Sequence, residues 1–301
     1  MSISGMLVAG TLALFCSTEA SETTFFAPGS VAGEFSIETG ALSGTLGVGG
    51  LSFGLHPIVH VADDTALTGP TPMGLLNYYR IFTTNFRYGE SLRARPSEKT
   101  FVSPDTVRMR FSATDYMPFD LTGVYTWVAP DTLDLETIVE AKTTLQDFDV
   151  FLASYLTPTF PVSSVYVKEE TGTARFMTAE PEHTVWQVFP RDPAAVALIK
   201  DGRWDIPPSP VNWAVRPEFA APLIYRRAAN SNLTVAMMAR PEDCFALFTS
   251  MRNEGHYSMY VSLFGRTLEP GEIARARVRL VVGELDDDAL LDRWRAFLES
   301  R

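Results

Sequence analysis

Apolar and polar residues alternate along most of the chain, in short runs separated by turn-forming residues. The runs start at residue 34 and recur roughly every ten residues, with Gly, Pro, Asp and Asn between them. In the run 133–141 (LDLETIVEA), leucine, threonine, valine and alanine share one face and the acidic residues share the other. Such alternation predicts β-strands with one buried side. We therefore expect strands at 34–38, 43–48, 58–61, 106–112, 124–128, 133–141, 148–156, 164–167 and 273–282, with a further aromatic strand that begins with Tyr257 and Tyr260.

Only two segments have the period of a helix. Residues 193–200 (PAAVALIK) follow Asp192, a suitable N-cap, and place proline at the first helical position. Residues 286–300 begin with acidic residues and carry an apolar stripe at helical spacing: Leu290, Leu291, Trp294, Phe297 and Leu298. The sequence thus predicts a mainly β protein, a large antiparallel β-sandwich whose core is covered by a C-terminal amphipathic helix.

The chain shows no internal repeat, and the short PPSP stretch at 207–210 is too brief for a linker between domains. Strand patterns continue on both sides of it, so we expect one domain at 21–301. Residues 5–16 (GMLVAGTLALFC) have the length of a signal-peptide core, although residues 1–5 contain no Lys or Arg. A signal peptide at 1–20 would imply a secreted or cell-envelope protein. Otherwise the segment is a first strand or an artefact of start-codon choice, and the protein is cytoplasmic.

Composition narrows the classes of partner. The net charge of −11 disfavours binding to a nucleic-acid backbone, and no stretch reaches the ~18 uncharged apolar residues of a membrane span. Arginine far outnumbers lysine, which suits carboxylate pairing across strands or an acidic ligand. Cys16 and Cys244 allow at most one disulfide and no cysteine zinc cluster. Motifs for nucleotides, dinucleotides and metalloproteases are missing, so we expect no cofactor.

The densest mixture of aromatic, amide and guanidinium groups lies at 74–89 (GLLNYYRIFTTNFRYG). Sugars stack their C–H faces on aromatic rings while polar side chains bind their hydroxyls, a composition typical of ligand pockets. We therefore expect a saccharide site here, or alternatively an ordinary sheet edge. Its candidate binding residues are Asn77, Tyr78, Tyr79, Arg80 and Arg87, joined by Arg191 and Trp213 from the loops around the short helix.

Acid–base chemistry needs titratable groups beside that site. His256 follows a turn and precedes an aromatic strand, while Glu242 and Asp243 occupy another turn. We expect these three to be the catalytic residues and to share one concave surface with Tyr79 and Arg80. The alternative for His256 is a structural histidine.

Other acidic residues have structural explanations. Asp134, Glu136 and Glu140 form either a carboxylate pair for catalysis or, as we favour, ion pairs across strands with Arg108 and Arg110 or with the row Arg275, Arg277 and Arg279. His56 and His60, four residues apart, suggest a metal site if Asp63 or Asp64 adds a third ligand. The blander alternative is two hydrogen-bonding residues near a turn.

The order of elements resembles the galactose-mutarotase-like β-supersandwich of aldose epimerases and other sugar-processing domains. The resemblance rests on 34–48, on 133–156 and on 256–282, which includes Leu268-Glu269-Pro270-Gly271-Glu272, similar to that fold's closing L-x-P-G-E turn. It implies a saccharide ligand. Sugar mutarotases carry a histidine in the segment similar to 151–155, where this chain has Ser154 and no histidine, and this departure argues against aldose 1-epimerase activity.

Three interpretations follow. The first is a carbohydrate-active protein that performs acid–base chemistry on a saccharide as an epimerase, lyase or glycosidase. The second is a non-catalytic carbohydrate-binding or structural β-sandwich. The third is a metal-dependent, cupin-like enzyme that uses His56 and His60.

Overall fold

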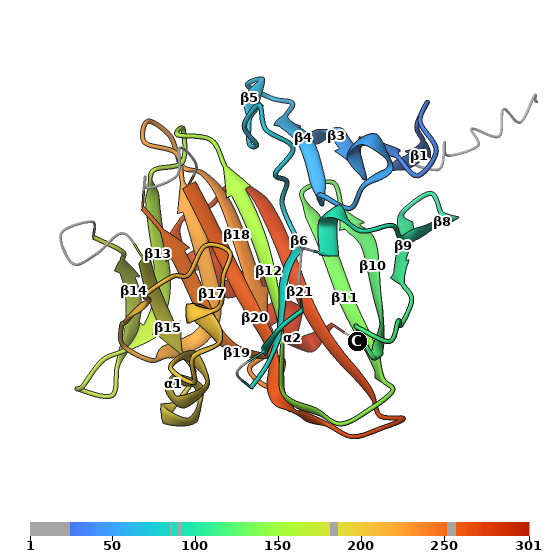
Figure 1. The fold of residues 1–301 in the computed structure, drawn as a ribbon. Coiled ribbons are helices and arrows are strands. Elements are labelled where there is room, and N and C mark those ends of the chain that lie inside the picture. The colour runs from blue at the N-terminus through green and yellow to red at the C-terminus, as the bar shows by residue number, and fades with distance from the viewer. Residues whose placement is uncertain (1–24, 85, 89–91, 181–185, 252–256, 301) are drawn as a thin grey trace, which may run out of the picture.

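The computed structural model describes residues 25–84, 86–88, 92–180, 186–251 and 257–300. The proposed signal segment 1–20, with Cys16, and the candidate His256 lie outside these residues. Two large sheets face each other, and a smaller sheet lies beside β8 and β9 (Figure 1). All strand pairs described are antiparallel apart from β15 and β16, which confirms the predicted antiparallel β-sandwich.

The nine-stranded sheet contains, in spatial order, β14 (Ala174–Thr178), β13 (Val162–Lys168), β17 (Phe219–Arg227), β18 (Leu233–Ala239), β21 (Ile273–Glu284), β11 (Thr132–Ala141), β10 (Phe119–Ala129), β9 (Thr106–Phe111) and β8 (Glu98–Ser103). The seven-stranded sheet contains β16 (Ala214–Val215), β15 (Trp186–Pro190), β19 (Cys244–Ser250), β20 (Tyr257–Leu268), β12 (Leu145–Leu156), β6 (Asn77–Thr83) and β7 (Phe86–Arg87). The third sheet contains β1 (Phe26–Pro28), β2 (Phe35–Glu38), β3 (Leu42–Leu46), β4 (Leu55–His60) and β5 (Thr65–Ala66).

The main hydrophobic core lies between the two large sheets. In β11 the residues expected on the buried face are buried, from Leu133 to Ala141, and they meet the inner face of β6 and β12. Tyr78 of β6 reaches across the core, and its hydroxyl lies 3.0 Å from the Thr137 hydroxyl of β11. A side chain at position 123 of β10 would collide with this ring, since a Cβ there would lie 2.5 Å from the Tyr78 oxygen. Glycine is therefore required at Gly123.

The C-terminal helix α2 (Asp287–Glu299) covers part of the outer face of the nine-stranded sheet, as the apolar stripe predicts. Asp286 caps it by accepting a hydrogen bond from the Ala289 amide at 2.8 Å. Phe297 is fully buried against β17, β18 and β21, whereas Trp294 is half-buried and donates from its indole N–H to the Ala239 carbonyl. The short helix α1 (Pro193–Ile199) begins after Asp192, which caps it as expected.

One end of the sandwich is held by Arg226 of β17, which is completely buried. Its guanidinium donates to backbone carbonyls of Phe160, Pro161, Ser250 and Ser258. Burial lowers its pKa to about 9. These carbonyls satisfy a buried charge that has no acidic partner among the described residues.

Candidate functional site

The outer face of the seven-stranded sheet carries a floor of aromatic rings. Alternate residues of β12 point outward, so Phe151 and Tyr155 lie on this face while Val150 and Leu152 enter the main core. Tyr79 from β6 and Tyr260 from β20 complete the aromatic floor. The rings of Phe151 and Tyr260 are stacked, with centroids 4.7 Å apart.

The segment 201–213, which we call the cover segment, lies over this aromatic floor. Trp204 packs on Phe82 and Phe151, each with centroids 4.9 Å apart, and Trp213 packs on Phe248 at 4.8 Å. The hollow that remains among these rings has a volume of about 20 Å³. That is room for one water molecule but not for a sugar ring.

Guanidinium groups surround Tyr79 at the edge of the floor. The Cζ atom of Arg80 lies 4.9 Å from the Tyr79 ring centre and 5.2 Å from that of Trp204, and Arg93 approaches the Tyr79 ring to 4.5 Å. Arg80 is buried, and its Nε and Nη1 atoms have no hydrogen-bond partner. The Nε1 atom of Trp213 is likewise buried and unpartnered. The site thus combines apolar faces with unsatisfied donors.

A buried carboxylate lies on the same outward side of β12. Asp149 is fully buried and meets Arg203 of the cover segment, with 3.4 Å between Oδ2 and Nη1. Arg203 also pairs with Asp201 at 2.9 Å. Burial raises the pKa of Asp149 to about 7, against the opposing charge of Arg203. A carboxyl group that titrates near neutrality is suited to proton transfer.

The predicted binding residues separate into outward and inward positions. Tyr79, Arg80 and Trp213 line the aromatic hollow, and Arg87 donates to the Pro208 carbonyl of the cover segment. Tyr78 points into the main core, and Asn77 is fully buried, where it donates to the Gly74 and Ala153 carbonyls. Arg191 pairs with Asp192 at 2.8 Å near the start of α1.

The predicted acids lie elsewhere. Glu242 and Asp243 occupy the turn before β19 and line a different hollow, together with Arg275 and Arg277 of β21. Asp243 accepts a hydrogen bond from the Arg277 amide at 2.8 Å, and burial raises its pKa. The hollow that contains Tyr79 and Arg80 includes neither acid, so the structure does not bring these residues together on one described concave surface. Their catalytic role, with that of His256, stays a prediction.

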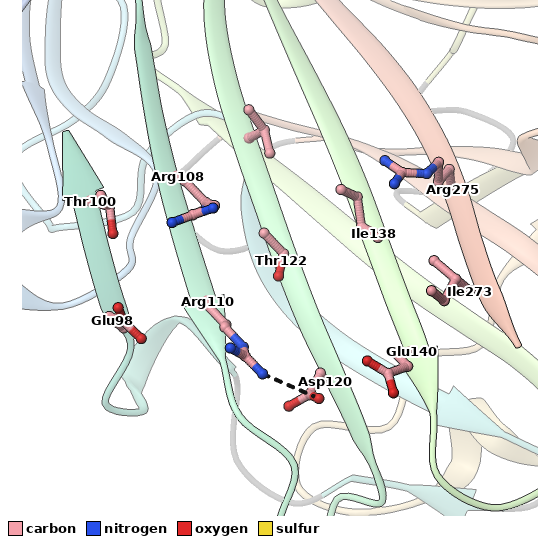
Figure 2. Close-up of a pocket in the computed structure, with 11 residues that line it drawn as sticks. Glu98, Thr100, Arg108, Arg110, Asp120, Thr122, Ile138, Glu140, Ile273 and Arg275 are labelled. Atoms are coloured by element: carbon pink, nitrogen blue, oxygen red, sulfur yellow. Dashed lines mark ion pairs between the residues drawn. The ribbon is translucent and has the colours of Figure 1, made fainter. Parts of the chain in front are cut away.

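A hollow of about 470 Å³ lies on the outer face of the nine-stranded sheet (Figure 2). It is open and lined by residues of both charges from β8, β9, β10, β11 and β21, with Thr122, Val124 and Ile138 along its centre. The predicted ion pairs with the row on β21 are confirmed, as Arg279 binds Asp134 through two hydrogen bonds and Arg275 lies 3.1 Å from Glu136. Arg110 instead meets Asp120 at 3.4 Å, and Glu140 meets Lys142.

The two histidines of β4 have separate partners. The Nδ1 atom of His56 lies 3.1 Å from the Thr68 hydroxyl, whereas that of His60 lies 2.7 Å from Asp63. In the part of the chain that the structure describes, no three His, Cys, Asp or Glu side chains are grouped so that they could hold a metal ion. The two histidines therefore match the hydrogen-bonding alternative. Nor does any described helix have the length and apolarity needed to cross a bilayer.

Searches of family models and of curated proteins find no match to this chain. Solved structures do match. The Slr1438 protein from Synechocystis sp. PCC 6803 superimposes with a TM-score of 0.52 at 12% identity, over 83% of this chain and 95% of that protein. A putative aldose 1-epimerase from Escherichia coli K12 gives a TM-score of 0.50 at 12% identity, over 83% and 98%. The chain has the β-supersandwich fold of these two proteins, as the order of its elements predicts.

Strand β12 contains residues 151–155, the segment that resembles the histidine-bearing segment of sugar mutarotases. Ser154 points away from the aromatic floor, because its Oγ accepts from the Leu76 amide at 2.9 Å in the core. The outward positions of β12 are instead Asp149, Phe151, Ala153 and Tyr155. Sequence reasoning missed Asp149 as a site residue, although a lone carboxylate in an apolar run (FDVFLASYL) is a usable signal.

Proposed function

We propose that this protein binds a saccharide on the aromatic floor of the seven-stranded sheet, with the cover segment moving aside to admit it. The observation that carries this proposal is the combination of two features. Aromatic rings on β6, β12 and β20 point outward from the sheet, and Arg80 and Trp213 have buried donors without partners. Apolar walls with a few orienting donors are what a sugar ring requires. The fold, shared with a putative aldose 1-epimerase, is consistent with a carbohydrate ligand.

A glycan array followed by calorimetric titration tests the proposal. Tyr79→Ala removes a stacking face and should weaken saccharide binding by about tenfold or more. Phe101→Ala, which removes an exposed ring of β8 on the other sheet, should leave the affinity unchanged. The proposal fails if no saccharide binds, or if Tyr79→Ala binds as tightly as the unmodified chain.

A second candidate function, acid–base catalysis on the bound sugar, is favoured by Asp149. Displacement of the cover segment would withdraw Arg203 and open Asp149 to the site. If the bound sugar keeps Asp149 out of water as the cover segment does, its pKa would stay raised, and the carboxyl group would donate a proton to a sugar oxygen and, once ionised, take one back.

Polarimetry on a panel of reducing sugars tests this second function. Asp149→Asn should lower the rate by about 10²–10⁴, whereas Tyr79→Ala should act mainly on KM. Asp243→Asn checks the sequence-based assignment of Glu242, Asp243 and His256 in the same assay. Activity that survives Asp149→Asn but not Asp243→Asn would move the chemistry to the other hollow.

A further inference from the structure

Two arginines beside the aromatic floor lack the acidic partner that a buried guanidinium normally has. Arg80 and Arg87 are 4% and 8% exposed, and among the described residues no carboxylate lies within ion-pair distance of either. Nε and Nη1 of Arg80 and Nε of Arg87 are buried without hydrogen bonds. Charges in this state are costly, because desolvation is not offset by a counter-charge.

The two guanidinium groups also act on each other. Burial lowers the pKa of Arg87, and the nearby positive charge of Arg80 lowers it further. Such a concentration of positive charge does not follow from composition, since the chain carries a net charge of −11. The other buried arginines are satisfied: Arg203 pairs with a carboxylate, and Arg226, which has no acidic partner, donates to four backbone carbonyls instead.

The backbone acceptors that the two arginines use belong to the cover segment, and Arg80 also makes a longer hydrogen bond of 3.4 Å from Nη2 to the Tyr79 hydroxyl. Arg80 donates from Nη2 to the Ser209 carbonyl at 2.9 Å, and Arg87 donates from Nη1 to the Pro208 carbonyl. These adjacent neutral oxygens occupy the place that an oxyanion with two oxygens could take. When the cover segment moves aside, both guanidinium groups lose their carbonyl partners together, and Arg80 keeps only the Tyr79 hydroxyl.

We infer that the saccharide carries an anionic group, a carboxylate or a sulfate ester, which Arg80 and Arg87 bind in exchange for the Pro208 and Ser209 carbonyls. This inference rests on the proposed saccharide function and names its substrate class. The planar fork of arginine matches a two-oxygen anion, and a charged acceptor strengthens each hydrogen bond. The aromatic floor then takes the apolar face of the same sugar residue.

The test compares calorimetric binding of an oligogalacturonate, a sulfated galactan oligosaccharide and a neutral galacto-oligosaccharide of equal length. Arg80→Met and Arg87→Met keep the apolar stems and should each weaken binding of the preferred anionic oligosaccharide by about 10- to 100-fold. Arg108→Met is the matched control, because it removes one charge from an exposed arginine of the nine-stranded sheet. The Arg108→Met variant should bind the anionic oligosaccharide as tightly as the unmodified chain does.

The outcomes separate the inference from the proposed function. Tighter binding of an anionic arm, lost in Arg80→Met but not in Arg108→Met, supports the inference, and the stronger arm identifies the anion. Equal binding of neutral and anionic arms overturns the inference and leaves saccharide binding intact. If the protein binds none of the three oligosaccharides and no other glycan on the array, both the inference and the proposed function are overturned.

A measurement on the unmodified chain covers the case in which a variant does not fold. Affinity for the anionic oligosaccharide should fall as NaCl is raised from 20 to 500 mM, since salt screens the attraction between the free anion and the two arginines that the displaced cover segment exposes, while affinity for the neutral one should hold. An anionic affinity that does not change with salt contradicts the inference.

Discussion

The outer faces of the two large sheets differ in how far they are covered and in how their charged groups are paired. The nine-stranded sheet, beyond α2, is open and lined by charged side chains that pair with neighbours across strands. The seven-stranded sheet presents aromatic rings that its own cover segment hides, and it leaves guanidinium donors without acidic partners. The first face has room, and several of its charges are paired across strands. The second has little room and unsatisfied donors, which is why we place function there.

The largest expected difference between the faces is in stability. Phe151 contacts Trp204, Phe248 and Tyr260, so Phe151→Ala should lower the free energy of unfolding by about 3–5 kcal/mol. Val124→Ala in the open hollow, where Val124 is half-buried, should cost less than about 1 kcal/mol. Urea denaturation measures both. Equal costs would mean that the aromatic floor is not a packed core and that the cover segment is loosely held.

A smaller effect should appear as a pH dependence. The pKa of Asp149 is raised to about 7 in the folded protein from its ordinary value of 3.8, so the folded state binds a proton that the unfolded state has released. Between pH 5 and pH 7, stability should therefore fall with rising pH, by about 2 kcal/mol from this group.

Asp149→Asn removes this contribution and should flatten the fall between pH 5 and pH 7. Glu136, an exposed acid of the open face, provides the control, because Glu136→Gln should leave the slope unchanged. A slope that survives Asp149→Asn would assign the titration to another group.

Alternating patterns predicted the fold because many of the strands have one polar side and one apolar side. Strands such as β9, β10 and β11 were found this way, as were both helices and the ion pairs on β21. Strand β18 was not, since LTVAMMA is buried throughout and shows no alternation, and β19 was expected only as an apolar strand after the turn of Glu242 and Asp243. The sequence also could not show which face of β6 is free, so Tyr78 was grouped with Tyr79 although their rings point to opposite sides.

The sequence identified only some of the residues around the aromatic floor, and their role in binding stays a prediction. Tyr79, Arg80, Arg87 and Trp213 were selected by chemistry and do lie around the aromatic floor or its cover segment. Glu242 and Asp243 were selected by residue type at a turn, and a turn does not reveal which hollow it borders. The pairing of Asp149 with Arg203 joins residues 54 positions apart, a long-range contact that local pattern does not encode.

Arg226 has a consequence for how the molecule opens. One side chain joins the connection between β12 and β13 to the end of β19 and the start of β20, through four carbonyls. If one of these segments separated from the others, the buried guanidinium would lose hydrogen-bond acceptors. We therefore expect the segments to unfold as a single cooperative unit. We therefore expect slow opening motions to begin in parts that this arginine does not hold, and the cover segment is one of them.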